Sequence, residues 1–488
     1  MSSIMALLAN AAGTNQVVLR DGAADFTYSE VVYKVQKIAR LIRKAGVKRI
    51  ALHADNSAAW ILTDLACQEA EVLCLPLPLF FSAQQRAFAL QSCGIDGVFT
   101  AAPQLFAEHF TETDAIACLP LTLLKNPHAS TPLLPENTSK VTFTSGSTGT
   151  PKGVCLSTAQ QLAQATALAE AVHIPNPVHL CVLPLSTLLE NIAGVYAPLR
   201  AGGTVIVRSL HDLGFSGSRL VDPQKFLQML TDVQPDSIIL IPQLLQLLVH
   251  AVKQGWKPPL LRFIAVGGSK VSAALITEAR ALGLPVYEGY GLSECASVVS
   301  LNTPAADQAG SCGKPLSHAE VQIRQGEIVV SGNAMLGYVG EPASWNPPDI
   351  YTGDLGYIDA QGFLHINGRK KNLLISSYGR NISPEWVESE LLSSPILAEA
   401  VVFGDARPNC VALLRAHSPD VLDIQLAAAV SVANARLPDY AQIKQWLRLD
   451  RPLAEGDGLV TENGRPRRDR IEQRFQQQIE TLYTNYTE

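Results

Sequence analysis

Seven short apolar runs constrain the fold of this chain most. They lie between Arg49 and Val266 and read "RIALHA", "VLCLPL", "GVFTA", "HLCVLPL", "TVIVR", "SIILI" and "RFIAV". Strands of this length that alternate with helices pack side by side as parallel sheets. The clearest helix spans residues 28–45, where apolar residues recur at helical spacing and basic residues occupy the other side. The chain is therefore expected to be an α/β protein.

Two units in the middle of the chain are especially clear. After "SIILI", Pro242 is placed to start a helix, because the first helical position does not need a backbone N–H. The following "LRFIAVGGSKVSAALITEARALGLPVYEGYG" has the pattern strand, glycine turn, helix, strand and glycine turn. This pattern predicts a βαβ unit, whose loops leave the strand ends at which α/β proteins bind ligands.

The pattern changes twice toward the C-terminus. From Gly326 the chain shows short strand and turn signals, "GEIVVSG", "GFLHINGRKKN" and "LLISSYG". After Asn372 a smaller segment of mixed helix and strand character follows, ending in the amphipathic "RIEQRFQQQIETLY". We therefore expect an N-terminal domain over residues 1–371, with mixed and parallel α/β sheets and a small β-rich part, and an α+β C-terminal domain over residues 372–488.

Composition excludes several classes of protein. The chain has 488 residues, 47% of them hydrophobic, which is enough apolar material for more than one core. A net charge of -6 argues against a nucleic-acid binder, because phosphate contacts need a basic surface. Nine scattered cysteines without a C-x-x-C pair fit reduced thiols in a cytoplasmic protein. We expect no secretory signal and no transmembrane segment, and peripheral contact with a membrane stays open.

The strongest chemical signal is "VTFTSGSTGTPKGV", residues 141–154. Five of the seven residues 144–150 carry a hydroxyl, the other two are glycines, and Lys152 follows directly after Pro151. Glycines let backbone N–H groups turn toward a ligand, hydroxyls donate to oxyanions, and a lysine adds a point charge. A flexible Ser/Gly linker is the alternative. An apolar strand precedes the stretch, however, so the sequence favours a polyphosphate site.

These residues resemble the phosphate loop of the adenylate-forming superfamily of acyl- and aryl-CoA synthetases, luciferases and peptide-synthetase adenylation domains. Further resemblances follow in the family's order: "YEGYGLSE", "YTGDLGYID", "INGRKKNLLISSYGRNISPEWVE" and "TENGRPRRDRI". With "FTYSE" and "NSAAW" near the N-terminus, they cover nearly the whole chain. Ordered motifs at this spacing are far more specific than a single motif. The resemblance implies a large N-terminal domain followed by a small, mobile C-terminal domain.

The resemblance also implies roles for the matched residues around the phosphates. The β- and γ-phosphates of ATP would be held by Thr144, Ser145, Gly146, Ser147, Thr148, Gly149 and Lys152. Ser293 would bond the α-phosphate. Glu294 would bind Mg²⁺, a hard cation that prefers oxygen ligands.

The nucleoside would be held farther along the chain. By the same resemblance, Tyr290 would lie against the adenine, and Asp354 and Arg369 would bind the ribose. The backbone around the adenine would come from Gly268, Ser269 and Gly289.

The implied reaction has two steps. A carboxylate attacks the α-phosphate of ATP to give an acyl-adenylate and pyrophosphate, and the thiol of CoA then displaces AMP. The first step builds charge at phosphorus, so it depends on fixed cations and Mg²⁺ more than on acid–base groups. In the family the C-terminal domain swings between the steps about a hinge, here Asn372. Gly379 in "SSYGRN" would then leave room for a pantetheine arm, from CoA or from carrier-protein phosphopantetheine.

One position departs from the family pattern. In the family a lysine follows the glycine of the terminal motif and contacts the α-phosphate and the substrate carboxylate, whereas here Arg465 follows Gly464. An arginine keeps a permanent charge and bonds oxyanions bidentately, but its planar fork is not a point charge. Three readings stay open: Arg465 takes over the role, adenylation is slow, or the arginines mainly serve a phosphate-rich partner such as CoA.

The substrate is predicted from one segment. "LPLSTLLENIAGVYAPLRAGG" resembles the family's acyl-pocket helix, with Thr187 where many acyl-CoA synthetases have histidine. The absence of an "FDxS"-type aspartate disfavours an amino-acid substrate. Leu188, Leu189, Ile192 and Val195 are expected to line an apolar tunnel, although such a stripe also fits an ordinary core. "GRKKNLLISSYGRNISPE" looks most like the long-chain fatty acyl-CoA synthetases, so a medium- or long-chain fatty acid is expected.

Two other functions remain open from the sequence. One is an acyl-AMP ligase that loads an acyl carrier protein or another nucleophile in a biosynthetic pathway. The other is an adenylate-binding protein with weak or lost adenylation, because Arg465 replaces the family lysine. The histidines form no H-x-x-x-H pattern, so a metal hydrolase has no support.

Overall fold

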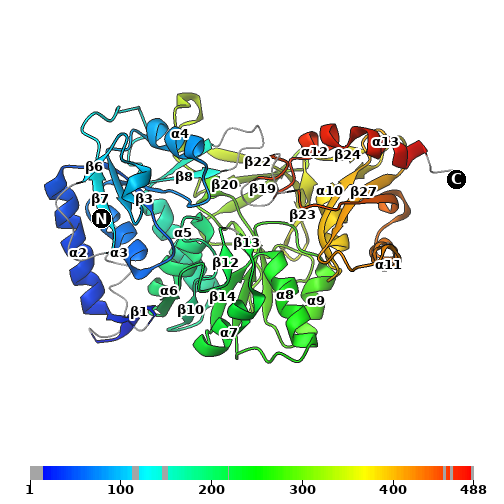
Figure 1. The fold of residues 1–488 in the computed structure, drawn as a ribbon, viewed down its shortest axis with the longest axis horizontal. Coiled ribbons are helices and arrows are strands. Elements are labelled where there is room, and N and C mark those ends of the chain that lie inside the picture. Colours follow the sequence, from blue (N-terminus) through cyan, green and yellow to red (C-terminus); the bar gives the residue numbers. More distant parts are fainter. Residues whose placement is uncertain are drawn as a thin grey trace.

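The computed structural model describes residues 15–22, 24–112, 120–144, 152–217, 219–453, 458–461 and 465–484. A large body of blue to yellow elements occupies most of the long axis, and the smaller orange and red part lies at one end (Figure 1). The expected α/β class, with a large N-terminal and a smaller C-terminal domain, is confirmed.

The first large sheet has nine strands in the order β18-β17-β16-β15-β14-β10-β11-β1-β2. The strands from β16 to β1 run parallel, and antiparallel strands close both edges. The bounds are β1 Val17–Asp21, β2 Ala24–Thr27, β10 Val178–Leu180, β11 Thr204–Val207, β14 Ser237–Leu240, β15 Phe263–Val266, β16 Val286–Tyr290, β17 Ser300–Leu301 and β18 Lys314–Pro315.

The second large sheet has eight strands in the order β21-β9-β8-β4-β3-β5-β7-β6. Its centre, β8 to β5, is parallel, whereas β9 and β21 pair antiparallel on one side and β7 and β6 on the other. The bounds are β3 Arg49–His53, β4 Leu73–Pro76, β5 Gly97–Thr100, β6 Thr111–Glu112, β7 Thr122–Lys125, β8 Lys140–Thr144, β9 Lys152–Leu156 and β21 Gly337–Tyr338.

The helices of the large body form layers around these sheets. One core contains side chains of both sheets and of α2 (Tyr28–Ala45), α3 (Ala58–Glu69), α5 (Thr158–Val172), the π-helix η2 (Glu190–Tyr196) and α6 (Ala197–Arg200), so these helices lie between the sheets. The outer face of the nine-stranded sheet packs against α7 (Pro223–Val233), α8 (Pro242–Lys253) and α9 (Ala273–Ala281). The outer face of the eight-stranded sheet packs against α4 (Ala83–Cys93).

Local sequence explains the ends of several helices. The helix expected at residues 28–45 is confirmed as α2, which starts with a capping box between Thr27 and Glu30 and ends at Gly46 in the left-handed conformation. Pro242 is the first residue of α8, as expected. The predicted βαβ unit is also confirmed, as parallel β15 and β16 joined by α9.

A small β-rich part follows the two large sheets. Its antiparallel sheet has the order β19-β20-β22-β23, with bounds Glu320–Arg324, Glu327–Ser331, Asp349–Ile358 and Leu364–Arg369. The short hairpin β12 (Phe215–Ser216) and β13 (Arg219–Leu220) lies apart from the large sheets. Single 3₁₀ turns occur at Pro103–Leu105, Ser293–Cys295, Pro342–Ser344 and Asp439–Ala441.

The C-terminal part has a core of its own. It contains the pair β24 (Leu374–Ile375) and β25 (Asn381–Ile382) and the sheet β26 (Leu397–Phe403), β27 (Cys410–Ala416) and β28 (Ile443–Arg448). Its helices are α10 (Pro384–Leu391), α11 (Asp423–Asn434), α12 (Arg468–Arg474) and α13 (Gln476–Thr484). Both clusters of buried residues in this part draw only on residues after 373, which agrees with a separately packed unit.

Two chain-wide expectations concern cysteines and membranes. The eight cysteines in the described ranges are buried and form no disulfide. Among the described helices, none combines the length and the apolar character required to span a bilayer. Cys118 lies outside the described residues.

Candidate active site

The ends of β8 and β9 frame the predicted phosphate loop. These strands pair antiparallel with Thr144 opposite Lys152, and the Thr144 hydroxyl donates to the Lys152 carbonyl at 3.4 Å. The hairpin thus brings the first and last predicted phosphate ligands side by side. The loop residues between them, 145–151, lie outside the described residues; they include the predicted phosphate ligands Ser145, Gly146, Ser147, Thr148 and Gly149.

Lys152 has two partners that the sequence did not indicate. Its Nζ lies 2.9 Å from a Glu341 carboxylate oxygen and 4.6 Å from the centre of the Tyr338 ring. Both partners come from the segment after β20, which β21 joins to β9. The ion pair is half exposed, so an incoming phosphate would compete with Glu341 for the lysine.

Tyr338 also orients the predicted magnesium ligand. Its hydroxyl donates to Oε1 of Glu294 at 2.9 Å, and the Glu294 backbone carbonyl accepts from Met335 at 2.7 Å. Glu294 and Ser293 form the 3₁₀ turn directly after β16. A carboxylate on a rigid turn beside a phosphate loop fits Mg²⁺, which binds through one or two carboxylates plus phosphate oxygens.

The backbone after Glu294 is strained. Ala296 and Ser297 have φ values of 60° and 116°, which non-glycine residues rarely adopt. A side chain on Gly291 would place its Cβ 1.6 Å from the Ser297 carbonyl oxygen. Only glycine fits there, so the turn that carries Ser293 and Glu294 is held tightly against β16.

Tyr290, Asp354 and Arg369 form a hydrogen-bonded row across two sheets. The Tyr290 hydroxyl donates to Asp354 at 2.6 Å, and Arg369 Nε lies 2.8 Å from the other carboxylate oxygen. Asp354 and Arg369 are direct partners in the pairing of β22 with β23. Burial raises the pKa of Asp354, and Arg369, Tyr290 and Arg465 oppose that rise.

The loop after β15 receives the terminal arginine. Gly268 has φ +84°, a conformation that favours glycine, and its carbonyl accepts a 2.5 Å hydrogen bond from Arg465. Ser269 is the next residue in this loop. Arg465 interacts electrostatically with Asp354 and Glu294, so the structure places the arginine of the C-terminal part among the predicted nucleotide ligands.

The other arginines of the terminal motif have structural partners. Arg468 donates to both carboxylate oxygens of Glu388, at 2.6 and 3.2 Å, and to the Val402 carbonyl. Both side chains are about nine-tenths buried, so this pair joins α10, β26 and α12. Arg470 is exposed and, within the described part of the chain, donates to the Gly458 carbonyl at 3.4 Å. Arg465 therefore differs from Arg468 and Arg470 in bonding a residue of the large body.

A buried acid lies below the adenine loop. Glu288 precedes Gly289 in β16 and is 4% exposed, and burial raises its pKa to about 7, against an attraction to Lys270. The Cys312 thiol donates weakly to this carboxyl at 3.8 Å. The sequence alone did not indicate Glu288, because the shift in its pKa comes from burial in the fold.

A small apolar cavity begins directly behind Gly289. A Cβ on this glycine would lie 2.9 Å from Leu301 and 3.9 Å from Val298, and both residues line the cavity. The cavity lies between the nine-stranded sheet and the layer of α5, η2 and α6. Its volume is about 80 Å³, and its lining is almost entirely apolar. It extends past the starts of β14 and β15, away from the predicted nucleotide site.

Of the four residues expected to line an apolar tunnel, Leu189 lines this cavity and the other three do not. Leu189, Ala193 and Ala197 line it, whereas Leu188 and Ile192 are buried in the core between the sheets. The hydroxyl of Thr187 donates to the Pro184 carbonyl at 2.7 Å and closes the turn before the helix. None of Thr187, Leu188, Ile192 and Val195 lines the cavity.

A buried His–Cys–Glu cluster borders the cavity. His179, Cys181 and Glu190 bring ligand-type atoms within 4.8 Å of one another. His179 bonds the Ser237 hydroxyl at 2.9 Å and Glu190 at 3.4 Å, and Glu190 also accepts from the Leu183 N–H. Protein groups thus satisfy these polar atoms without a metal ion.

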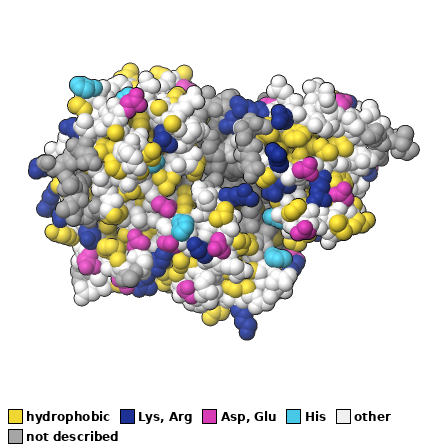
Figure 2. Space-filling model, in the orientation of Figure 1, with side chains coloured by type: hydrophobic (Ala, Val, Ile, Leu, Met, Phe, Trp, Pro, Cys, Tyr) yellow, Lys and Arg dark blue, Asp and Glu magenta, His cyan; other side chains and the backbone are white. Residues whose placement is uncertain are grey.

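Asn372 and Gly379 lie where the two parts meet. Asn372 follows β23, and its side chain donates to Glu385 of α10 at 2.6 Å. Gly379 turns between β24 and β25 with φ +73°, and an added Cβ would meet nothing within 4 Å. Figure 2 shows Lys and Arg side chains gathered along the boundary between the large body and the C-terminal part.

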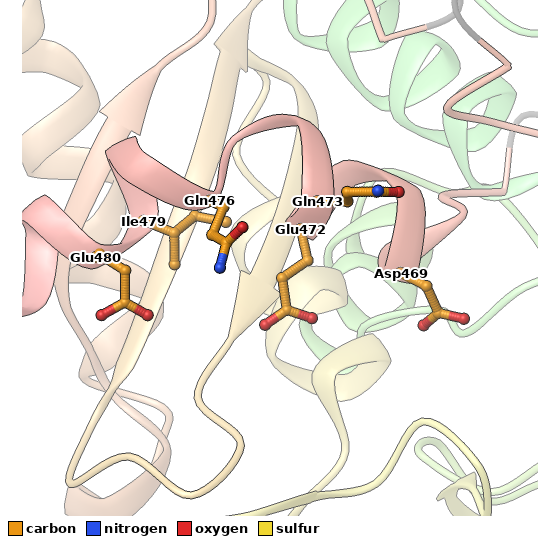
Figure 3. Close-up of a pocket in the computed structure, with 6 residues that line it drawn as sticks. All are labelled: Asp469, Glu472, Gln473, Gln476, Ile479 and Glu480. Carbon is orange, nitrogen blue, oxygen red and sulfur yellow. The ribbon is translucent and has the colours of Figure 1, made fainter.

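A larger hollow lies on the C-terminal helices, away from these residues. It has a volume of about 420 Å³ and is lined by Asp469, Glu472, Gln473, Gln476, Ile479 and Glu480 of α12 and α13 (Figure 3). Arg407 bonds Glu480 at its rim. Three carboxylates make the hollow unsuited to the phosphates of ATP or CoA.

Family models match both parts of the chain. The model for AMP-binding enzymes matches residues 8–339, and the model for the AMP-binding enzyme C-terminal domain matches residues 371–487. Together they confirm the resemblance that the motifs indicated.

Individual proteins resemble the chain over most or part of its length. The 2-succinylbenzoate–CoA ligase of Bacillus subtilis is 30% identical over 85% of this chain and 86% of its own. The long-chain-fatty-acid–CoA ligase FadD15 of Mycobacterium bovis is 30% identical over 44% of this chain and 41% of its own. The solved structure of o-succinylbenzoate coenzyme A synthetase from Bacillus subtilis, in complex with ATP and magnesium ion, has a TM-score of 0.76 at 24% identity, and the match covers 96% of this chain and 98% of that one.

Proposed function

Because the chain belongs to the AMP-binding enzyme family and is an AMP-forming acid–CoA ligase, we propose that it activates a medium- or long-chain fatty acid with ATP and Mg²⁺ and transfers the acyl group to CoA. The observation that carries this proposal is the apolar cavity lined by Val298 and Leu301, the two residues whose side chains a Cβ on Gly289 would meet. An acid whose carboxylate reaches the α-phosphate would extend its chain into that cavity.

In the proposed first step, a carboxylate oxygen bonds to the α-phosphorus and the bond to the pyrophosphate oxygen breaks. Negative charge builds on the phosphoryl oxygens, and fixed donors stabilise it. Arg465 supplies one cation from the C-terminal part, at the loop of Gly268. Lys152 supplies another at the end of the phosphate loop, once a phosphate replaces Glu341. Ser293 adds a hydroxyl from the turn after β16.

The proposed nucleotide contacts follow from the hydrogen-bonded row. Tyr290 lies at the end of β16 and donates to Asp354, which keeps both residues in place before a nucleotide binds. Asp354 then offers the ribose hydroxyls a carboxylate whose charge Arg369 balances. Gly268, Ser269 and Gly289 contribute backbone rather than side chains to the adenine pocket. Bound Mg²⁺ would neutralise phosphate charge, and Glu294 would hold it in the orientation that Tyr338 fixes.

The second step requires a thiol at the carbonyl carbon. We place the domain boundary between residues 371 and 372, with Asn372 as the hinge and residues 1–371 and 372–488 as the two domains. A rotation would break the side-chain hydrogen bond from Asn372 to Glu385, together with those from Ser272 to Glu390 and from Arg465 to Gly268. The CoA sulfur bonds to the acyl carbon and AMP leaves, and the open space at Gly379 admits the pantetheine arm.

The acid itself has two candidate classes. The apolar lining of the cavity and the similarity to the fatty-acid ligase FadD15 support an alkyl chain. The similarity to 2-succinylbenzoate–CoA ligase, over a longer part of the chain, favours an aromatic acid as the second candidate. The cavity is smaller than the roughly 300–1,000 Å³ of most ligand pockets, so either acid must widen it.

The proposed acceptor and location have their own support. CoA is named as the acceptor because similar proteins along most of the chain are CoA ligases. An acyl carrier protein is the alternative acceptor. Eight buried thiols without a disulfide support a reducing compartment, so we place the enzyme in the cytoplasm.

The deciding experiment measures pyrophosphate release with ATP and Mg²⁺ across saturated fatty acids of increasing length and a set of benzoic and cinnamic acids. Each acid is tested with CoA, with a phosphopantetheinylated carrier protein and with neither. We expect the highest kcat/KM for a medium- or long-chain fatty acid and faster turnover with CoA. Preference for an aromatic acid would overturn the substrate proposal, and acceleration only by the carrier protein would overturn the acceptor. The absence of pyrophosphate release with every acid would support an adenylate-binding protein instead.

A further inference from the structure

A buried ion pair lies between the two large sheets. Lys140 and Asp64 are 0% and 1% exposed, and the lysine Nζ lies 2.9 and 3.1 Å from the two carboxylate oxygens. Charges are rarely this deeply buried, because removal from water costs several kcal/mol per ion unless further bonds compensate. Asn191 and Tyr196 of the π-helix η2 provide those bonds.

The two helix residues bond both members of the pair. The Tyr196 hydroxyl accepts from Lys140 at 3.1 Å and donates to Asp64 at 2.5 Å. The Asn191 amide accepts from Lys140 through its oxygen and donates to Asp64 at 3.0 Å through its nitrogen. Lys140, Asp64, Asn191 and Tyr196 thus form one network, which we call the buried tetrad, and Gln68 adds a further bond to the Tyr196 hydroxyl.

The spacing of the helical residues explains the π-helix. Asn191 and Tyr196 are five positions apart, and in an α-helix such residues point about 140° away from each other. A π-helix bonds each N–H to the carbonyl five residues earlier, which brings positions five apart toward one face. Ala197 N–H bonds the Ile192 carbonyl in this way. Both side chains can therefore reach the same ion pair only in the π register.

η2 and the residues that flank it also contribute to the wall of the apolar cavity. Leu189, Ala193 and Ala197 line the apolar cavity, while Leu188 and Ile192 are buried in the core. At its other end the tetrad holds Lys140, the first residue of β8, whose last residue, Thr144, begins the phosphate loop. The tetrad therefore joins the strand of the phosphate loop to the wall of the acid cavity.

We propose that the buried tetrad is a positioning device that selects the π register of η2 and thereby determines which acids the cavity accepts. This inference rests on the proposed function for its substrate readout. No tetrad residue lines the cavity, and none of its hydrogen bonds goes to a described residue that is predicted to bind the nucleotide, so the tetrad acts through Leu189 and Ala193. Loss of the tetrad lets the segment take the α-helical register, which replaces the cavity wall by another set of side chains.

The test replaces the tetrad in steps of increasing severity. Tyr196→Phe removes one hydroxyl and keeps the ring, Asn191→Leu removes both bonds of the amide, and Lys140→Met with Asp64→Leu replaces the ion pair by apolar groups of similar size. Val35→Ala in the core of α2 is the control, because it creates a buried void without touching the tetrad. Acid preference, the KM for ATP, and hydrogen–deuterium exchange of the peptide covering residues 188–200 are measured for each folded variant.

We expect the tetrad variants to change the ratio of kcat/KM between a shorter and a longer acid by about tenfold or more, with the KM for ATP near wild type. The η2 peptide should exchange faster while the α9 peptide keeps its rate. The Val35→Ala control should lower stability without changing the preference. An unchanged acid ratio together with unchanged exchange in the η2 peptide would overturn the inference. If the wild type activates no acid at all, the proposed function fails, and the exchange of the η2 peptide alone decides the role of the tetrad. Variants that do not fold leave the decision to Tyr196→Phe.

Discussion

The guanidinium of Arg465 donates a 2.5 Å hydrogen bond to the carbonyl oxygen of Gly268, which lies 197 positions earlier in the chain. The bond joins the C-terminal part to the loop that follows β15 in the large body. Arg465 is also within electrostatic reach of Asp354 and Glu294, so its charge lies among the residues predicted to bind ATP. This placement favours the reading in which Arg465 performs the role of the family lysine.

Replacing Arg465 by alanine should impair the adenylation step. Loss of one fixed donor at a developing oxyanion typically costs about 10²–10³-fold in kcat, and we expect a decrease of that size in pyrophosphate release. Thioester formation from a preformed acyl-adenylate and CoA should stay close to wild type. Arg470→Ala is the matched control, because Arg470 lies in the same segment and, among the described residues, donates to the Gly458 carbonyl. Equal losses in both half-reactions would show that Arg465 is not specific to adenylation.

Replacing Tyr338 by phenylalanine should weaken the response to magnesium. The Tyr338 hydroxyl orients Glu294, and removal of a group that orients a metal ligand typically lowers metal affinity by about 10–100-fold. We expect the Mg²⁺ concentration for half-maximal pyrophosphate release to rise by about that factor. Tyr357→Phe serves as the control, since Tyr357 is half exposed and stacks on His365. If the magnesium dependence is unchanged, Tyr338 does not contribute to magnesium binding.

Replacing Glu288 by glutamine should change how stability depends on pH. Burial raises the pKa of Glu288 to about 7, from an ordinary value of 4.5, so the folded protein holds a proton that the unfolded chain has released. This contribution to stability is fully present below about pH 4.5, falls as pH rises and is lost above about pH 7. Between these two pH limits, the contribution of Glu288 to the free energy of unfolding changes by about 3 kcal/mol. The check is urea unfolding at pH 5, 6, 7 and 8. The free energy of unfolding of Glu288→Gln should increase relative to that of wild type up to about pH 7, and the difference should stay constant above it.

Replacing Ala193 by phenylalanine should shift the acid preference toward shorter chains. Ala193 lies on the cavity wall next to α5, and an aromatic ring there would fill much of the free volume of about 80 Å³. We expect kcat/KM for long acids to fall by about tenfold or more, while short acids and ATP binding are affected little. Ala428→Phe on the exposed side of α11 controls for the bulk of the substituent. An equal loss of kcat/KM for short and long acids would show that the acid chain binds outside this cavity.

Sequence reasoning succeeded where a motif is local. The hairpin of β8 and β9 brings Thr144 opposite Lys152 because strand, loop and strand are adjacent in the chain. Ser293 and Glu294 share one turn after β16 for the same reason. The spacing of apolar residues in α2 predicted both its ends, since its caps are encoded by neighbouring residues.

The same reasoning failed where partners are distant. Tyr338 and Glu341 reach Lys152 because β21 pairs with β9. No local sequence pattern predicts a strand of two residues. The stripe of η2 that lines the cavity follows a π register, which the buried ion pair of Lys140 and Asp64 favours from outside the helix. The structure buries Leu188 and Ile192 in the core between the sheets, whereas Leu189 lines the cavity, and their assignment to an acid pocket stays a prediction.

By itself the sequence determined the alternation of strands and helices, the hydroxyl- and glycine-rich phosphate loop, and the arginine at position 465, because each depends on residues close together in the chain. Only the tertiary structure decided that Arg465 reaches Gly268, that Tyr290 meets Asp354, and that a cavity opens behind Gly289. These features need segments far apart in the chain to pack at ångström separations, and burial, backbone register and charge pairing fix such separations only in the folded state.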